Sequence, residues 1–181
     1  MDNKPWIALF SQTGSEIAAL SAKIGVAPSL ILTNNIDSST WHPFIREQKT
    51  ISDDHETIMQ TLLNENKDNN HLVTLHGYLK IIPNNICSAM DIYNGHPGLI
   101  TRYPELKGLD PQEKVAENIS RFVFIGSVVH KVTTDVDSGE VLSSFAVLNG
   151  CNSREEVYSN LRTTSLHAWL KFFKDNKCEL V

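Results

Sequence analysis

The stretch Trp6-Ile7-Ala8-Leu9-Phe10, followed by Ser11-Gln12-Thr13-Gly14-Ser15-Glu16, decides the fold of this chain. The first five residues form an apolar run that predicts a buried strand, and the small and polar residues after them predict a turn. Residues 17–24 carry apolar side chains at helical spacing, and residues 29–33 predict a second strand. A strand, a helix and a strand in succession predict parallel strands joined by a right-handed crossover.

The rest of the chain continues this alternation of strands and helices. The further strands are expected near residues 49–51, 71–76, 92–94, 122–133 and 140–147. The further helices are expected from residue 53 to 63 or beyond, over 111–120 with Asp110 as N-cap, and after the capping box Ser153-Arg154-Glu155-Glu156. Asp135-Val136-Asp137-Ser138-Gly139 predicts the turn of a hairpin. We therefore expect an α/β fold, an open twisted, mostly parallel sheet with helices on both faces, in a single domain over residues 1–181.

Composition excludes several classes of protein. The net charge of −5 over 181 residues argues against a nucleic-acid groove, which requires a basic patch. No apolar run reaches membrane-spanning length, and the polar start of the chain lacks the apolar region of a signal peptide. Cys87, Cys151 and Cys178 are far apart and show no zinc-binding spacing, so we expect reduced thiols. These features predict a cytoplasmic protein that binds neither nucleic acid nor membrane.

Asn94 and His96 form the most informative chemical pair. Their side chains are two residues apart, so on an extended segment they leave the backbone on the same side. An amide can steady an oxyanion, an imidazolium can donate a proton to it, and a carboxylate can hold that imidazole charged. Asp135 and Asp137 are both candidate carboxylates, and the residues alone do not choose between them. This set can move an acyl group onto an amine without a metal.

Open α/β sheets bind ligands beyond the carboxyl ends of their strands. The turn at Gly14-Ser15, the segment Tyr78-Leu79-Lys80 and the pair Asn94 and His96 all fall there, so we expect them to form one site. The turn alone fits either a tight strand-to-helix connection or a phosphate at a helix N-terminus. Glu16 argues against the phosphate, because its carboxylate would repel it.

The sequence resembles the folate-dependent formyltransferase family over most of its length. The first strand and its turn, and the Gly77-Tyr78-Leu79-Lys80-Ile81-Ile82 segment, carry part of the resemblance. The other motifs that carry it are Asn94-Gly95-His96-Pro97-Gly98-Leu99, Arg102-Tyr103-Pro104, His130-Lys131-Val132-Thr133 and Asp137-Ser138-Gly139-Glu140-Val141. Among these, the pairing of Asn-x-His-Pro with Asp-x-Gly is fairly specific to the family.

The resemblance implies roles for individual residues. Asn94, His96 and Asp137 match the catalytic amide, imidazole and carboxylate of the family, with His130 behind them. The folate-binding residues that it implies are Tyr78, Leu79, Lys80, Ile81 and Ile82, with Asp135, Val136 and Gly139 closing over the pterin. The substrate-binding residues that it implies are Gly14, Ser15, Glu16 and Pro97. Asp137 would raise the pKa of His96 by opposite charge.

The reaction implied is direct transfer of the formyl group of 10-formyltetrahydrofolate, as co-substrate, to a small-molecule primary amine, with no metal. Glycinamide ribonucleotide, in purine biosynthesis, is the default acceptor. Glu16 stands where the family carries asparagine at a phosphate, and Leu166-His167 stands where ribonucleotide enzymes carry glutamate before histidine. A different amine, such as an amino sugar on a nucleotide or a modified nucleotide, is therefore an alternative acceptor. A non-catalytic folate- or nucleotide-binding module is the alternative of another class, and the sequence does not indicate an oligomeric state.

Overall fold

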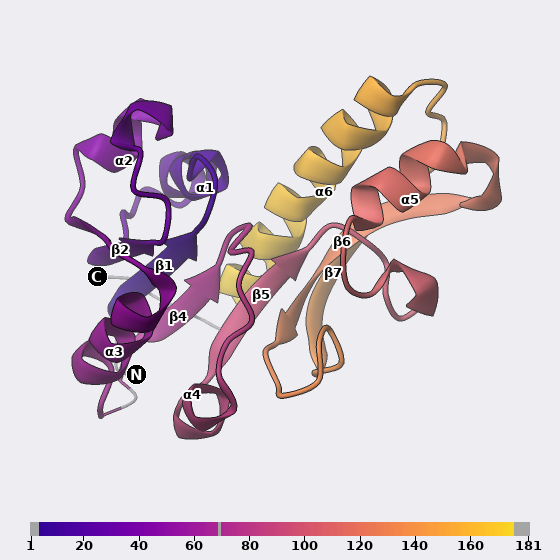
Figure 1. The fold of residues 1–181 in the computed structure, drawn as a ribbon. Helices are drawn as coiled ribbons and strands as arrows, with labels where there is room; N and C mark the ends of the chain where they lie inside the picture. Colours follow the sequence, from indigo (N-terminus) through magenta and orange to yellow (C-terminus); the bar gives the residue numbers. More distant parts are fainter. Residues whose placement is uncertain (1–3, 69, 176–181) are drawn as a thin grey trace. The chain divides into compact units, whose positions relative to one another are not determined.

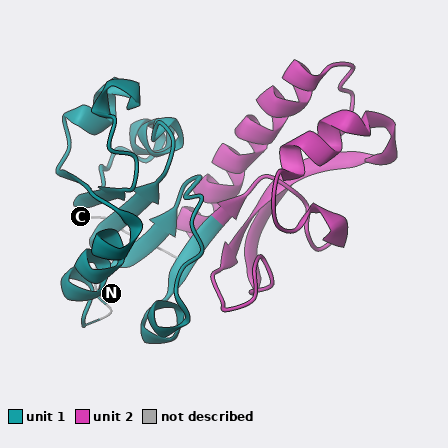
Figure 2. Ribbon diagram, viewed as in Figure 1, with its two compact units in different colours: residues 1–94, 177–181 teal, residues 95–176 magenta. Residues whose placement is uncertain are grey.

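The computed structural model describes residues 4–68 and 70–175, so Cys178 lies outside the described residues. The chain divides into two compact units, one ending at Asn94 and one beginning at Gly95 (Figure 2). Strand β5 (Ile92–His96) carries the chain from the first unit into the second.

The first unit is built on parallel strands in the order β3-β2-β1-β4-β5. Figure 1 labels β1, β2, β4 and β5. The strands that precede β5 are β1 (Trp6–Phe10), β2 (Leu30–Thr33), β3 (Thr50–Ser52) and β4 (Leu72–Leu75). Strands β1, β2 and β4 are buried at every position, as expected where helices cover both faces of a parallel sheet. The short apolar runs therefore became the strands that their composition predicts.

The helices of the first unit lie in the connections between these strands. They are α1 (Ser15–Ile24), α2 (Pro43–Arg46), α3 (His55–Glu65) and α4 (Asn84–Ala89), with a 3₁₀ turn at Ser38–Thr40. The chain leaves β1 for β2 in one direction and returns from β3 to β4 in the other. Right-handed crossovers in opposite directions place α1 and α3 on opposite faces of the sheet.

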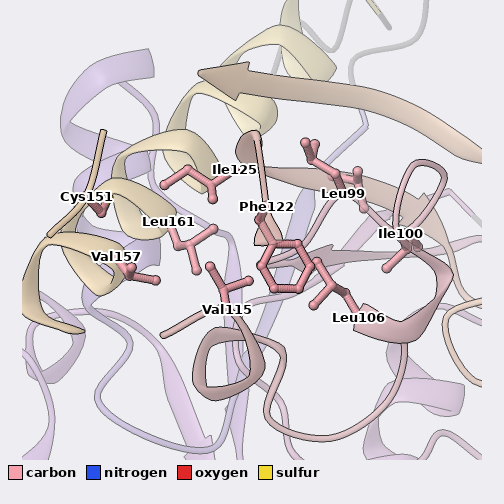
Figure 3. Packing of buried hydrophobic residues seen from close by; sticks show 10 residues of the cluster. Leu99, Ile100, Leu106, Val115, Phe122, Ile125, Cys151, Val157 and Leu161 are labelled. Atoms are coloured by element: carbon pink, nitrogen blue, oxygen red, sulfur yellow. The ribbon is translucent and has the colours of Figure 1, made fainter. Parts of the chain in front are cut away.

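The second unit is a hairpin covered by a long helix. Strands β6 (Phe124–Lys131) and β7 (Val141–Leu148) pair antiparallel, with an irregularity between Val129 and His130. Its helical elements are η2 (Pro104–Leu106), α5 (Pro111–Glu117), η3 (Ile119–Arg121) and α6 (Arg154–Asp175). Figure 3 shows its core cluster, which contains Leu99, Ile100, Leu106, Val115, Phe122, Ile125, Val128, Cys151, Val157 and Leu161.

The predicted fold class is confirmed, with corrections at particular elements. Strand β5 does not end at Asn94 but continues through His96, and α2 was not expected from the residues before β3. Asp110 precedes α5 as predicted, yet its side chain makes no cap hydrogen bond, because its backbone is left-handed. The capping box is confirmed in one direction only: Ser153 Oγ accepts from the Glu156 N–H, whereas the Glu156 carboxylate accepts from Asn152.

None of the helices in the described part of the chain is both long enough and apolar enough to cross a membrane.

Candidate active site

His96 is the last residue of strand β5 and the second residue of the second unit. The N–H of Gly98 donates to the His96 carbonyl at 2.9 Å, which makes a tight turn around Pro97. Proline fixes its own φ, so the turn holds the backbone on the carboxyl side of the imidazole. His96 is buried, with 5% of its surface exposed. The turn and the burial together leave the ring little freedom.

Asp137 lies between two histidines. Its Oδ2 is 3.2 Å from Nδ1 of His96, and its Oδ1 is 3.3 Å from Nε2 of His130. The rings of the two histidines meet edge to face, with centroids 6.4 Å apart. His130 stands on β6 and Asp137 in the turn that follows it, so the hairpin itself brings the carboxylate to both rings.

The turn that carries Asp137 has an unusual backbone. Asp137 has φ of 49°, in the left-handed region that residues other than glycine seldom adopt. Aspartate tolerates this conformation better than most side chains do. Gly139 lies so close to the backbone of Lys131 that an added Cβ would collide with its carbonyl. The tight turn therefore requires glycine at 139, two residues after the left-handed Asp137.

A backbone segment after β5 completes the surroundings of His96. The carbonyl of Leu106 lies 2.8 Å from Nε2 of His96, and the N–H of Gly108 donates to Oδ2 of Asp137 at 2.9 Å. Lys107 Nζ donates to Ser138 Oγ at 3.2 Å. Because the Leu106 side chain is anchored in the core cluster (Figure 3), its carbonyl is held against the imidazole.

Burial acts against the charged forms of both His96 and Asp137, but it decides the net pKa shift only of His96. Burial lowers the pKa of His96 below its ordinary value of 6.5, and the Asp137 carboxylate and the Leu106 carbonyl oppose this without overcoming it. The expected influence of Asp137 has the predicted sign, but the expected net rise of the His96 pKa is wrong. Burial acts to raise the pKa of Asp137, yet the hydrogen bond from His130, the charge of His96 and the Gly108 N–H bring it below its ordinary value. Asp137 is thus a stable carboxylate.

The first unit brings the predicted turn and the predicted folate segment together. The N–H of Ser11 donates to the Gly77 carbonyl at 3.2 Å, and the N–H of Leu79 donates to Ser11 Oγ at 2.8 Å. Nδ1 of His76, which directly follows β4, lies 2.8 Å from Oε2 of Glu16. Glu16 thus has a buried partner that sequence reasoning missed.

The segment from Tyr78 to Ile82 is buried at both ends and exposed over its three middle residues. Tyr78 and Ile82 are buried, whereas Leu79 is 68% and Ile81 73% exposed, and Lys80 is exposed as well. The Tyr78 hydroxyl lies 2.8 Å from Nδ1 of His55, and burial raises its pKa. Exposed apolar side chains on such a segment are available to cover a bound apolar ring.

The remaining predicted residues lie as follows. Asn94 pairs in register with Leu75, the last residue of β4, and shares strand β5 with His96. Asp135 and Val136 are exposed, and Gly14 and Ser15 lie at the start of α1. The structure brings His96, Asp137 and His130 together, and the convergence of Asn94 on them stays a prediction. Leu106 and Gly108 were missed because they act through their backbones, which leave no signal in side-chain identity.

Within the described residues, no group of three or more His, Cys, Asp or Glu side chains is arranged to hold a metal ion.

Known proteins resemble this chain in sequence and in fold. A family described as formyl transferase matches residues 36–170. No curated protein matches the sequence significantly. The phosphoribosylglycinamide formyltransferase of Anaplasma phagocytophilum is 23% identical, with a TM-score of 0.78 over 95% of this chain and 86% of that one. That of Streptococcus pneumoniae is 19% identical, with a TM-score of 0.79 over 96% of this chain and 99% of that one. A formyltetrahydrofolate deformylase of Pseudomonas putida is 16% identical, with a TM-score of 0.73 over 95% of this chain and 65% of that one. At these identities the solved structures show a shared fold.

Proposed function

Because this chain belongs to the formyl transferase family, whose pattern matches residues 36–170, we propose that it transfers the formyl group of 10-formyltetrahydrofolate to a small-molecule primary amine. The observation that carries the proposal is the contact of 3.2 Å between His96 and Asp137. Both side chains are at least nine-tenths buried, in a setting where a charged pair acts more strongly than it does in water.

In the proposed reaction the amine nitrogen attacks the formyl carbon, and the carbonyl electron pair moves to the formyl oxygen. The amide of Asn94 and the protonated ring of His96 stabilise that oxygen, and Asp137 stabilises the ring. When the carbon–N10 bond breaks, its electron pair returns to N10, which takes up a proton as the attacking amine loses one. A well-aimed donor to such an oxygen lowers the barrier by about 2.7–4 kcal/mol.

This chemistry requires His96 to exchange a partner. Its Nδ1 faces Asp137 and its Nε2 faces the Leu106 carbonyl, so Nε2 is the atom to turn toward the substrate. Nε2 keeps one hydrogen bond in this exchange, and the cost is that the Leu106 carbonyl gives up its imidazole partner. The proposed folate-binding residues are Tyr78 to Ile82, together with Asp135, Val136 and Gly139, and the exposed side chains of Leu79 and Ile81 support this part of the proposal.

The acceptor is the finer part of the proposal. Glycinamide ribonucleotide is the first acceptor to test, because the known proteins of the same fold include phosphoribosylglycinamide formyltransferases. A different amine is the second candidate, and the carboxylate of Glu16 beside Gly14 and Ser15 favours it.

The test is turnover. The chain is mixed with 10-formyltetrahydrofolate and a panel of primary amines, and the release of tetrahydrofolate is followed. Release that depends on amine supports the proposal. Release without amine would indicate hydrolysis, and folate binding without release would indicate a binding module.

Replacing His96 by alanine should abolish turnover and leave folate binding largely intact. His71→Ala is the matched control, because His71 precedes β4 at the amino end of the sheet and should leave turnover unchanged. Turnover that survives in His96→Ala would show that another group donates the proton.

A further inference from the structure

A chain of hydrogen bonds runs through the buried part of the first unit to Glu16. Trp6 Nε1 donates to Thr74 Oγ1 at 2.7 Å, and Thr74 Oγ1 lies 2.8 Å from Nε2 of His76. Nδ1 of His76 then lies 2.8 Å from the Glu16 carboxylate. Trp6, Thr74 and His76 are buried, so these contacts are shielded from water.

The direction of this chain follows from its donors. An indole N–H can only donate, so Thr74 accepts from Trp6. The His76 tautomer with its proton on Nδ1 allows Nε2 to accept a hydrogen bond from the buried Thr74 hydroxyl. In this tautomer the Nδ1–H of His76 donates a hydrogen bond to the Glu16 carboxylate. The buried network therefore orients the Glu16 carboxylate.

Glu16, in the first turn of α1, lies beyond the carboxyl end of β1, where an open α/β sheet is expected to bind a ligand. The order β3-β2-β1-β4-β5 reverses direction between β1 and β4, because β1 leads to β2 and β4 leads to β5 on the opposite side. Such a switch point opens a crevice beyond the carboxyl ends of the strands. Glu16 follows β1 and His76 follows β4, and Asn94 is in register with the last residue of β4.

The exposure of Glu16 sets its chemistry toward a ligand. Its side chain is 24% exposed, whereas that of His76 is 0% exposed, so Glu16 alone of this pair reaches the edge. An ionised carboxylate only accepts hydrogen bonds. A phosphate brings negative charge to the same position and is repelled, whereas a hydroxyl or an ammonium group can donate to the carboxylate.

We propose that Glu16, oriented by His76, is a specificity-determining residue that excludes an acceptor amine with a phosphate at this turn and favours one with an uncharged or cationic hydrogen-bond donor there. This inference rests on the proposed function, because it concerns the acceptor of the same reaction.

The test compares two acceptors that differ by one group, glycinamide ribonucleotide and the riboside left after removal of its phosphate. Glu16→Gln removes the charge and keeps an oxygen that can accept from His76. We expect the wild-type protein to use the riboside at least as well as the ribonucleotide. Glu16→Gln should raise kcat/KM for the ribonucleotide about tenfold, or about 1.4 kcal/mol, and change that for the riboside less than about twofold.

Glu56→Gln is the matched control, since Glu56 is also in the first turn of a helix, α3, and is exposed. It should leave both values unchanged. A wild-type preference for the ribonucleotide would overturn the proposal, and so would an unchanged ratio in Glu16→Gln.

A second measurement separates this inference from the proposed function. Calorimetric titration of both ligands into the wild-type protein and Glu16→Gln gives the ratio of their affinities, ribonucleotide to riboside, without any turnover. If no amine accepts a formyl group, the proposed function is wrong, while the binding ratio still decides the role of Glu16. If Glu16→Gln does not fold, the wild-type preference between the two ligands decides alone.

Discussion

At the scale of single residues, both ring nitrogens of His96 face oxygen atoms that accept hydrogen bonds. Nδ1 faces Asp137 and Nε2 faces the Leu106 carbonyl. A neutral imidazole has one N–H and satisfies one of these, whereas an imidazolium satisfies both. Burial acts against the charged ring and lowers the pKa of His96. The ring is therefore held close to its partners yet costs free energy to protonate.

The free-energy cost of protonating His96 in the folded protein predicts how stability depends on pH. A histidine whose pKa is lowered in the folded state contributes its full stability above the unfolded pKa near 6.5. The contribution is lost as pH falls through 6.5 toward the folded pKa, because the unfolded chain takes up the proton first. Urea unfolding at pH about 7.5 and about 5.5 should show a larger loss of unfolding free energy in the wild-type protein than in His96→Asn.

His71, whose pKa burial also lowers, remains in both proteins, so the difference reports on His96. The lowered pKa of Asp137 keeps that carboxylate charged across this range. An equal loss in both proteins would mean that His96 costs nothing to protonate.

Asp137 offers a second test at this scale. Asp137→Asn removes the charge that stabilises the His96 ring and keeps a side chain that tolerates a left-handed backbone. We expect kcat for formyl transfer to fall about 10²–10⁴-fold, the usual contribution of positioned acid–base groups. Asp110→Asn is the matched control, because Asp110 is also left-handed, with φ of 51° against 49°. Similar kcat values for the two variants would rule out the proposed role of Asp137.

The sequence predicted the side chains of this cluster better than it predicted their surroundings. Spacing alone left Asp135 and Asp137 as alternatives, and the structure separates them: Asp135 is exposed, while Asp137 contacts two histidines. The Leu106 carbonyl could not be predicted, because every residue has a carbonyl and only the path of the chain selects one. The same holds for the His76 partner of Glu16, which is 60 residues away in the sequence.

At the scale of elements, the segment from η2 to Asp110 holds the pair of His96 and Asp137 from one side. Its contacts are the Leu106 carbonyl on His96 and the Gly108 N–H on Asp137. Gly108 has φ of 79°, and an added Cβ would meet nothing within 4 Å. A side chain at this position therefore costs backbone strain without a collision.

Gly108→Ala should lower the free energy of unfolding by about 1–2 kcal/mol, the cost of a left-handed backbone at a residue with a Cβ. Gly150→Ala is the control, since Gly150 also has open space around it and its φ lies outside the left-handed range. It should be neutral, or stabilise by about 0.4–1 kcal/mol. Urea titration of both variants measures the difference, and equal stabilities would show that the segment does not need its left-handed glycine.

Elements were predictable where apolar residues follow one period. Strand β1 and helix α3 lie where the pattern put them, and Asp54 caps α3 by accepting from Thr57. Strand β5 was predicted too short, because Asn94, Gly95 and His96 lack the apolar pattern of a strand. The polar side chains of Asn94 and His96 are the proposed catalytic groups, and residues with such a role need not follow local strand propensity. Helix α2 has four residues, which is too short for helical periodicity to appear.

At the scale of the whole molecule, β5 belongs to both compact units. Its first three residues pair with β4 in the first unit, and its last two, Gly95 and His96, belong to the second. The formyl transferase pattern, residues 36–170, also covers parts of both. Unfolding of the first unit would release the strand that positions His96. We therefore expect the two units to unfold together, as the single domain predicted from the sequence requires.

The tryptophans can report on each unit separately. Trp6 and Trp41 lie in the first unit and Trp169 in the second, and all three are buried. Trp169→Phe leaves reporters in the first unit only, and the double variant Trp6→Phe/Trp41→Phe leaves one in the second only. Within each variant, the urea transition seen by fluorescence should coincide with that seen by far-ultraviolet circular dichroism, as in all-or-none unfolding. Because the two signals are compared in the same variant, the stability lost by the substitution does not affect the result. A fluorescence transition that precedes the dichroism transition in one variant would show that its reporter unit unfolds alone, and the chain would then be two domains joined through β5.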